Sequence, residues 1–119
     1  MKIRGQRPAG FPVRPVVIHM PAEIDGSNAA QVEAALALVM GPGVGVVIAD
    51  LTRTAWCDVL GAEAFAVARG VALDSHAVLR LAVPSPRVRR VFALTKLDRV
   101  LPVYPSLDAA LGPVLAWGA

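Results

Sequence analysis

The sequence is short of the residue types from which metal centres and disulfides are built. Among its 119 residues there is one cysteine, Cys57, and there are two histidines, His19 and His76. A lone cysteine can form no internal disulfide, and a zinc site would need a cluster of Cys and His side chains that this sequence does not provide. We therefore predict that Cys57 is a small buried apolar residue and that the protein uses no cofactor.

Aromatic residues and long apolar runs are also scarce. Aromatic side chains make up 5% of the chain, whereas hydrophobic residues make up 55%, so Val, Leu and Ala must fill the core. No apolar run approaches the roughly 20 residues of a membrane span, and residues 1–8 are not followed by the apolar segment of a signal peptide. We expect a cytoplasmic protein with one folded domain over residues 13–119, preceded at residues 1–12 by a tail or a poor first strand.

The excess of positive charge is small. Twelve Lys and Arg residues against nine Asp and Glu residues leave a net charge of +3. Basic residues gather near the start of the chain and again between residues 87 and 99. A basic patch can bind nucleic acid, but no aromatic platform or recognition helix accompanies this one. A solvated face is the simpler interpretation, and we do not expect a nucleic-acid partner.

Short apolar strands alternate with amphipathic helices along the chain. The strands are expected at residues 16–20, 44–51, 77–83 and 100–104. The helices are expected to begin after Ser27, near Val59, at Pro86 and after Ser106. Four such alternations favour an α/β domain, with a mixed, mostly parallel sheet of four to five strands packed against about four helices.

Local signals refine these elements. We expect Ser27, Ser85 and Ser106 to cap helix N-termini, because a hydroxyl accepts a hydrogen bond from a free backbone N–H. Pro102 predicts an edge strand, since proline cannot donate to a sheet, and Pro113 is expected to distort or end the last helix. In the second helix we expect an inward face of small and apolar residues, which comprises Leu60, Ala64, Val67, Ala68 and Val71.

Several segments resemble, in order and spacing, the STAS domain family of bacterial anti-sigma factor antagonists. They are residues 20–25 (Met-Pro-Ala-Glu-Ile-Asp), 47–51 (Val-Ile-Ala-Asp-Leu), 58–61 (Asp-Val-Leu-Gly), 81–98 and 104–111. The resemblance covers about residues 14–111 and implies a STAS-like fold. It also implies a function, because a STAS antagonist binds an anti-sigma factor, often a serine kinase, and so frees a sigma factor.

The chain departs from this family at the start of the second helix. The family pattern there is Asp-Ser-Ser/Thr-Gly, and the kinase inactivates the antagonist by phosphorylating the first serine. Here the sequence reads Asp58, Val59, Leu60 and Gly61, so the phosphoacceptor position holds a valine without a hydroxyl. The resemblance therefore predicts a binding surface that has kept its scaffold and lost its phosphorylation site.

The candidate partner-binding residues follow from the resemblance. They are Asp25, Thr54, Asp58, Val59, Leu60 and Gly61. Simpler roles stand beside several of these: Asp25 fits a turn, and Asp58 fits a helix cap. Thr52 or Thr54 could be a substitute phosphoacceptor. Trp56 fits the core, and it also fits an interface anchor, because tryptophan is enriched among residues that dominate binding.

No pattern of catalytic residues stands out. Asp74, Ser75 and His76 are adjacent, whereas the members of a catalytic triad converge from separate segments. The glycine-rich residues 41–45 lack the Lys-Ser/Thr of a phosphate-binding loop. We predict a non-enzymatic interaction module that regulates transcription by binding an anti-sigma factor or a kinase-like regulator. The alternatives are a module that senses a ligand or nucleotide, and a degenerate paralogue that pairs with other STAS domains.

Overall fold

The computed structural model describes residues 15–118, with side chains described through residue 112, so the expected tail at residues 1–12 lies outside this part. The strands β1 (Val16–His19), β3 (Val46–Asp50), β5 (Val78–Ala82) and β6 (Val103–Tyr104) form one sheet in the order β1-β3-β5-β6. Each neighbouring pair is parallel. The predicted α/β class is confirmed, and β6 takes the edge position that Pro102 predicted.

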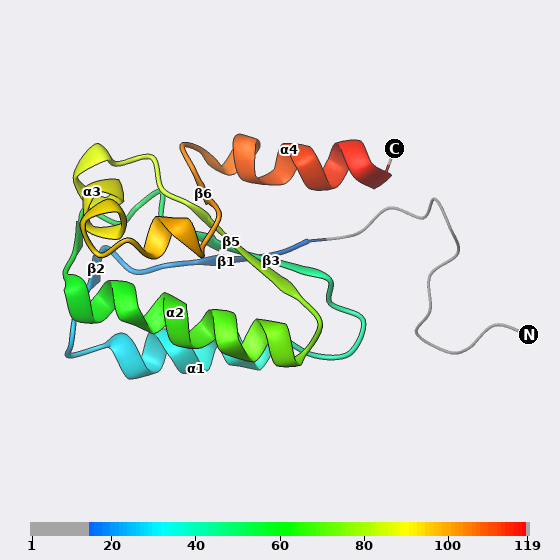
Figure 1. The fold of residues 1–119 in the computed structure, drawn as a ribbon, viewed down its shortest axis with the longest axis horizontal. Coiled ribbons are helices and arrows are strands. Elements are labelled where there is room, and N and C mark those ends of the chain that lie inside the picture. Colours follow the sequence, from blue (N-terminus) through cyan, green and yellow to red (C-terminus); the bar gives the residue numbers. More distant parts are fainter. Residues whose placement is uncertain (1–14, 119) are drawn as a thin grey trace, which may run out of the picture.

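Helices cover both faces of this sheet (Figure 1). The helices α1 (Ala29–Val39) and α2 (Val59–Asp74) lie on one face, and α4 (Leu107–Gly118) lies on the other. The short helix α3 (Pro86–Leu94) and the 3₁₀ turn η1 (Leu97–Arg99) contribute to the same core as α1 and α2. Within residues 15–118, no helix is both long enough and apolar enough to cross a membrane.

The central strand β3 explains how the two cores are divided. All five of its residues are buried, as expected for a parallel strand covered on both faces. Val47 and Ala49 point into the main core, beneath α1, α2 and α3. Val46 and Ile48 point into the smaller core, beneath α4.

A second, two-stranded sheet continues beyond the ends of β1 and β3. It pairs β2 (Glu23–Ile24) with β4 (Trp56–Cys57) in parallel, with Glu23 opposite Trp56 and Ile24 opposite Cys57. Strands this short carry no recognisable sequence period, and we did not predict this sheet. It brings the segment that leads into α1 beside the segment that leads into α2.

Helix ends match two of the three predicted serine caps. Ser85 accepts a hydrogen bond from the Val88 N–H at 3.3 Å, and Ser106 accepts one from the Ala109 N–H at 3.0 Å. The cap predicted at Ser27 is wrong, because α1 begins one residue later, with Asn28 at its N-cap. The Ser27 N–H and hydroxyl both donate to the carboxylate of Asp25 instead. Pro113 does not end the last helix, which continues to Gly118.

Helix α2 turns a face of small residues inward. Its buried residues are Gly61, Ala62, Ala64, Phe65, Ala68 and Ala72, and α2 packs along α1 through this face. The inward placement predicted for Leu60 and Val67 is wrong, since they are 58% and 53% exposed. These two residues are seven positions apart and therefore share a face of the helix, which points to solvent.

Candidate protein-interaction site

The N-terminus of α2 is fixed by Asp58. Its carboxylate oxygen Oδ1 accepts a hydrogen bond from the Gly61 N–H at 2.8 Å, which confirms the predicted cap. The Asp58 N–H in turn donates to the Ile24 carbonyl oxygen at 3.1 Å. The start of α2 is therefore tied both to its own first turn and to strand β2.

Gly61 lets this first turn lie directly on β2. A Cβ atom at residue 61 would stand 2.7 Å from the Ile24 carbonyl carbon and nearer still to its oxygen, which is closer than real Cβ atoms approach. Because the obstacle is backbone, it cannot swing aside as a flexible side chain would. The absence of a side chain at residue 61 therefore permits the close approach, and Gly61 is itself buried.

Asp25 belongs to the same corner of the molecule. Its carboxylate accepts hydrogen bonds from the Ser27 hydroxyl at 2.5 Å and from the Ser27 N–H at 2.8 Å. The side-chain bond from Ser27, followed by the backbone bond, holds the pKa of Asp25 below its ordinary value. The next residue, Gly26, lies under Leu60: a Cβ at residue 26 would be 2.9 Å from Leu60 Cδ1. The structure thus brings the Asp25 turn and the exposed start of α2 together.

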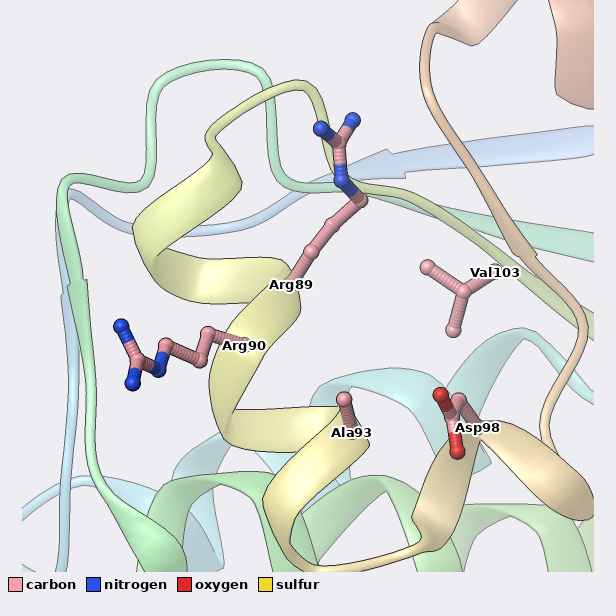
Figure 2. Close-up of a pocket in the computed structure, with 5 residues that line it drawn as sticks. All are labelled: Arg89, Arg90, Ala93, Asp98 and Val103. Carbon is pink, nitrogen blue, oxygen red and sulfur yellow. The ribbon is translucent and has the colours of Figure 1, made fainter.

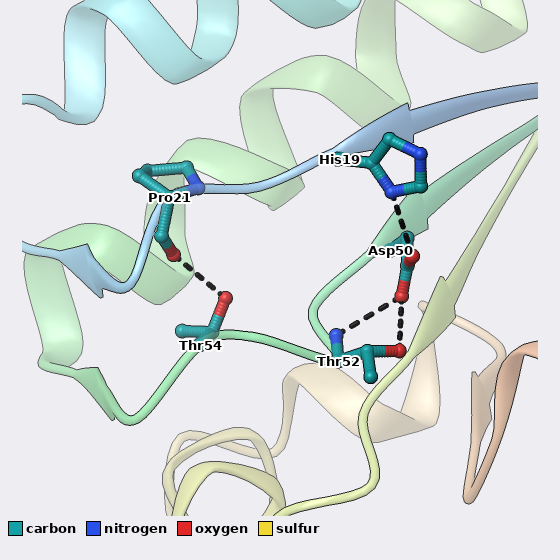
Figure 3. Close-up of polar contacts among 5 residues, drawn as sticks. All are labelled: His19, Pro21, Asp50, Thr52 and Thr54. Atoms are coloured by element: carbon teal, nitrogen blue, oxygen red, sulfur yellow. Dashed lines mark hydrogen bonds and ion pairs between the residues drawn. The ribbon is translucent and has the colours of Figure 1, made fainter.

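A polar cluster organises the loop between β3 and β4 (Figure 3). One oxygen of the buried Asp50 accepts hydrogen bonds from the Thr52 N–H, at 3.0 Å, and from the Thr52 hydroxyl. The other oxygen lies 2.8 Å from His19 Nδ1. Burial alone would raise the pKa of Asp50, but the hydrogen bonds from Thr52 and His19 outweigh it, and the pKa is lowered. Asp50 therefore stays ionised and holds the loop in place.

Thr54 lies inside the protein, which removes it from the predicted surface. It is 2% exposed, and its hydroxyl donates to the Pro21 carbonyl oxygen at 2.8 Å. Thr52 is exposed, but its hydroxyl donates to Asp50. Neither hydroxyl is free in this conformation, so the structure does not favour either threonine as a substitute phosphoacceptor.

An apolar hollow opens beside the start of α2. Its volume is about 270 Å³, and it is lined by Trp56, Cys57, Asp58, Val59, Arg87, Val91, Leu94 and Thr95. Trp56 is 49% exposed, Val59 52% and Leu94 73%, so the prediction of Trp56 as a core residue is wrong. The contribution of α3 was not predicted. The sequence offered one signal for it. Leu94 is a large apolar residue that lies outside the core-facing apolar stripe of α3, which indicates an exposed apolar surface.

Cys57 forms the floor of this hollow as a neutral, inert thiol. It is buried, as predicted. Burial, and to a lesser extent the nearby Asp58 carboxylate, raises the pKa of the thiol to about 12. Because the thiolate is the reactive form of cysteine, Cys57 is not poised as a nucleophile. Within the described residues there is also no group of three metal-ligating side chains.

A second hollow, of about 470 Å³, lies on the other side of α3 and is lined by Arg89, Arg90, Ala93, Asp98 and Val103 (Figure 2). Arg89 Nη1 donates to the carbonyl oxygens of Val83 and Pro84, at 3.3 and 3.4 Å. Arg90 extends from the side of α3 that faces away from Asp98 and Val103 (Figure 2). The arginines therefore do not converge on one point in this hollow, as an anion site would require.

The sequence and the fold match one family. The STAS domain model matches residues 7–110 of the chain. A protein of Mycobacterium tuberculosis named as an anti-anti-sigma factor is 38% identical over 104 residues, which cover 82% of this chain and 67% of that relative. The chain belongs to the STAS domain family. The predicted resemblance is thereby confirmed.

Solved structures of other proteins share this fold. An anti-sigma factor antagonist from Mycobacterium paratuberculosis is 26% identical with a TM-score of 0.74, over 92% of this chain and 89% of that one. A sulfate transporter family protein from Wolinella succinogenes has a TM-score of 0.75 at 18% identity, over 92% of this chain and 88% of that one. At that identity the likeness concerns the fold alone. The STAS fold thus serves proteins of different names, and the function has to be argued from the site.

Proposed function

We propose that this STAS domain is an interaction module of the anti-sigma factor antagonist type. In this proposal the chain binds an anti-sigma factor or a kinase-like regulator and so influences transcription. The binding surface comprises Asp25, Asp58, Val59 and Leu60, with Trp56 and Leu94 beside them. Gly61 supports this surface from below, and Thr54 has no part in it.

The observation that carries the proposal is the exposure of apolar side chains at the start of α2. Val59 and Leu60 are 52% and 58% exposed, although they occupy the first turn of a helix whose other face is fully packed. Val59 lines the apolar hollow together with the exposed Trp56 and Leu94, and Leu60 is its neighbour in the first turn of α2. Large apolar side chains that cluster on a surface are typical of a protein-binding site.

Val59 keeps this surface apolar, because a valine cannot be phosphorylated. It is the first residue of α2, the position at which the family pattern places a phosphorylated serine. A phosphate there would bring about −1.5 to −2 charges, which the helix N-terminus tolerates but an apolar partner surface does not. Since valine accepts no phosphate, we infer that binding is not switched at residue 59 and that any regulation acts elsewhere.

The proposal does not require catalysis. Two of the similar proteins are named as an anti-anti-sigma factor and an anti-sigma factor antagonist, and neither name is that of an enzyme. The one thiol near the site is neutral. An anion- or nucleotide-sensing role gains little support from the helix termini, because carboxylates of Asp25 and Asp58 lie at the starts of α1 and α2.

One observation favours a second candidate function, pairing with another STAS domain. A separate apolar patch of Leu73, Val78 and Val100 lies near the edge strand β6, and these side chains are exposed. An edge strand with apolar neighbours can pair with another chain. This surface is distinct from the residues around Val59, so variants can tell the two candidates apart.

Affinity capture followed by mass spectrometry tests the first proposal. The bait is the purified chain on resin, incubated with lysate of the cells that make it, in parallel with Val59→Asp and Val67→Asp variants. Both valines lie on α2 and are equally exposed, at 52% and 53%. An acidic residue at the first helical position favours the helix, so Val59→Asp should fold normally.

We expect an anti-sigma factor or kinase-like protein to be captured by the natural chain and by Val67→Asp but not by Val59→Asp. Recovery of the same partner by all three baits would mean that the partner binds at a surface other than the start of α2. Recovery of STAS proteins alone, in a manner sensitive to Val78→Asp, would replace the first candidate with the second.

A further inference from the structure

The size and exposure of the hollow beside α2 indicate what kind of partner group it can bind. Its volume of about 270 Å³ is at the small end of the roughly 300–1,000 Å³ of small-molecule sites. It is open to solvent, and Trp56 from β4 and Leu94 from α3, which both line it, are exposed. One large apolar side chain of a protein partner suits this space better than a cofactor does.

The rim of the hollow is basic on the α3 side. Arg87 lines the hollow and is exposed, and it forms no ion pair within residues 15–112. Arg90, three residues later on the same helix, is also exposed but lines the second hollow. Arg87 is therefore the basic group on the rim of this hollow.

Asp58 also lines the hollow, but its carboxylate caps Gly61 and forms no ion pair with Arg87 within residues 15–112, so the Arg87 guanidinium is available to a partner carboxylate. We propose that the partner inserts one large apolar side chain between Trp56 and Leu94, and that a partner carboxylate within about one helical turn of it contacts Arg87. The inference rests on the proposed function and specifies the partner segment: apolar at its centre and acidic beside it.

The two parts of this contact have different roles. Buried aromatic and aliphatic anchors supply most of the affinity of an interface, whereas charges at the rim govern partner choice and association rate. Removing Leu94 should therefore weaken binding of any partner segment. Reversing the charge of Arg87 should select against acidic segments in particular.

Peptide display tests the inference without knowledge of the natural partner. A random library of 12-residue peptides is selected on the natural chain, and the enriched peptides are measured by fluorescence polarisation. The panel is the natural chain, Leu94→Ala, Arg87→Glu and Arg99→Glu. Arg99 is exposed like Arg87 but lies in η1 and does not line the hollow, so it is the matched control.

We expect enriched peptides to carry a large apolar residue with Asp or Glu within four positions. Leu94→Ala and Arg87→Glu should each weaken binding roughly tenfold, Arg99→Glu should leave it unchanged, and the Trp56 indole N–H signal should shift on titration. Peptides that lack acidic residues, or that bind Arg87→Glu as well as the natural chain, overturn the inference. Failure to enrich any peptide sensitive to Leu94→Ala also overturns it.

These outcomes are separable from those of the capture experiment. Suppose that an anti-sigma factor is captured in a manner sensitive to Val59→Asp, but the peptides show no preference for acidic residues. The proposed function is then supported and the inferred partner chemistry is wrong. If acidic apolar peptides bind the hollow and no anti-sigma factor is captured, the inferred chemistry is supported and the proposed function is wrong.

Discussion

Gly61 illustrates how one residue sets the position of a whole helix end. The backbone of Ile24 occupies the space that a side chain at residue 61 would need. At Gly70, also in α2, a Cβ atom would meet nothing within 4 Å. The same substitution at the two glycines should therefore have opposite effects.

We predict that Gly61→Ala lowers the free energy of unfolding by about 1–3 kcal/mol, because the new methyl group forces α2 away from β2. Gly70→Ala should instead raise it by about 0.5–1 kcal/mol, because alanine is the better helix former. Urea denaturation of both variants measures the difference. Equal effects at the two positions would contradict the close approach of α2 to β2.

Asp50 predicts how stability depends on pH. Its pKa is lowered in the folded protein from an ordinary value of 3.8, so the folded state prefers the ionised form. The corresponding stabilisation is present above the ordinary value and is lost as the pH falls through the folded value. The natural chain should therefore lose stability more steeply than Asp50→Asn as the pH is lowered below about 4.

The measurement is the urea midpoint of both proteins between neutral pH and pH 3. The advantage of the natural chain over Asp50→Asn should be largest near neutrality and should shrink in acid. A constant difference across this range would mean that the hydrogen bonds from Thr52 and His19 do not favour the ionised carboxylate.

At the scale of elements, α2 has to satisfy two requirements at once. Its inner face of small residues allows α1 to approach closely, and its outer face carries the large apolar residues Leu60 and Val67. The inner face also holds one large residue, the fully buried Phe65, so large apolar side chains lie on both sides of the helix. Helical periodicity predicted the inward placement of Ala64, Ala68 and Val71 correctly and that of Leu60 and Val67 wrongly.

The close packing of α1 on α2 makes a direct prediction. Ala68→Leu should lower the free energy of unfolding by about 1–3 kcal/mol, since Ala68 is buried and extra methyl groups overfill the interface. Val67→Leu, one residue away on the exposed face, should change it by less than about 0.5 kcal/mol. Thermal or urea unfolding of both variants measures the difference. A larger loss for Val67→Leu would mean that Val67, and not Ala68, faces the protein interior.

The major strands and helices were predictable because their signals are local. A fully apolar run marked β3, serine caps marked α3 and α4, and proline marked the edge strand β6. The two-residue strands β2 and β4 were not predictable, since their pairing depends on where β1 and β3 end. The Ser27 cap failed because α1 begins at Ala29, with Asn28 and not Ser27 at the N-cap position.

At the scale of the whole molecule, the candidate site joins segments that are distant in sequence. Asp58 could be recognised because aspartate is a common helix cap, and both Asp58 and Gly61 could be recognised because they match the family pattern at residues 58–61. The role of α3 was hidden, because the contact of Leu94 and Arg87 with the start of α2 is purely tertiary. Thr54 was misplaced for the same reason: its partner, the Pro21 carbonyl oxygen, lies 33 residues away.

The proposal that residue 59 occupies a former phosphorylation site can be tested by placing a serine there. We predict that Val59→Ser turns the chain into a phosphate acceptor if its captured partner is a serine kinase, because Asp58 and Gly61 already match the family pattern. Incubation of the partner and ATP with this variant, followed by intact-mass measurement, detects the added phosphate. The natural chain is the control, and its mass should not change.

Hydrogen–deuterium exchange of the complex between this chain and its captured partner tests the central claim most directly. We predict that binding slows exchange in residues 56–62 and 86–95, which form the two sides of the apolar hollow, and leaves residues 73–78 and 100–104 unchanged. Protection confined to residues 73–78 and 100–104 would place the partner at the β6 edge. That result would contradict the assignment of the interaction surface to the start of α2.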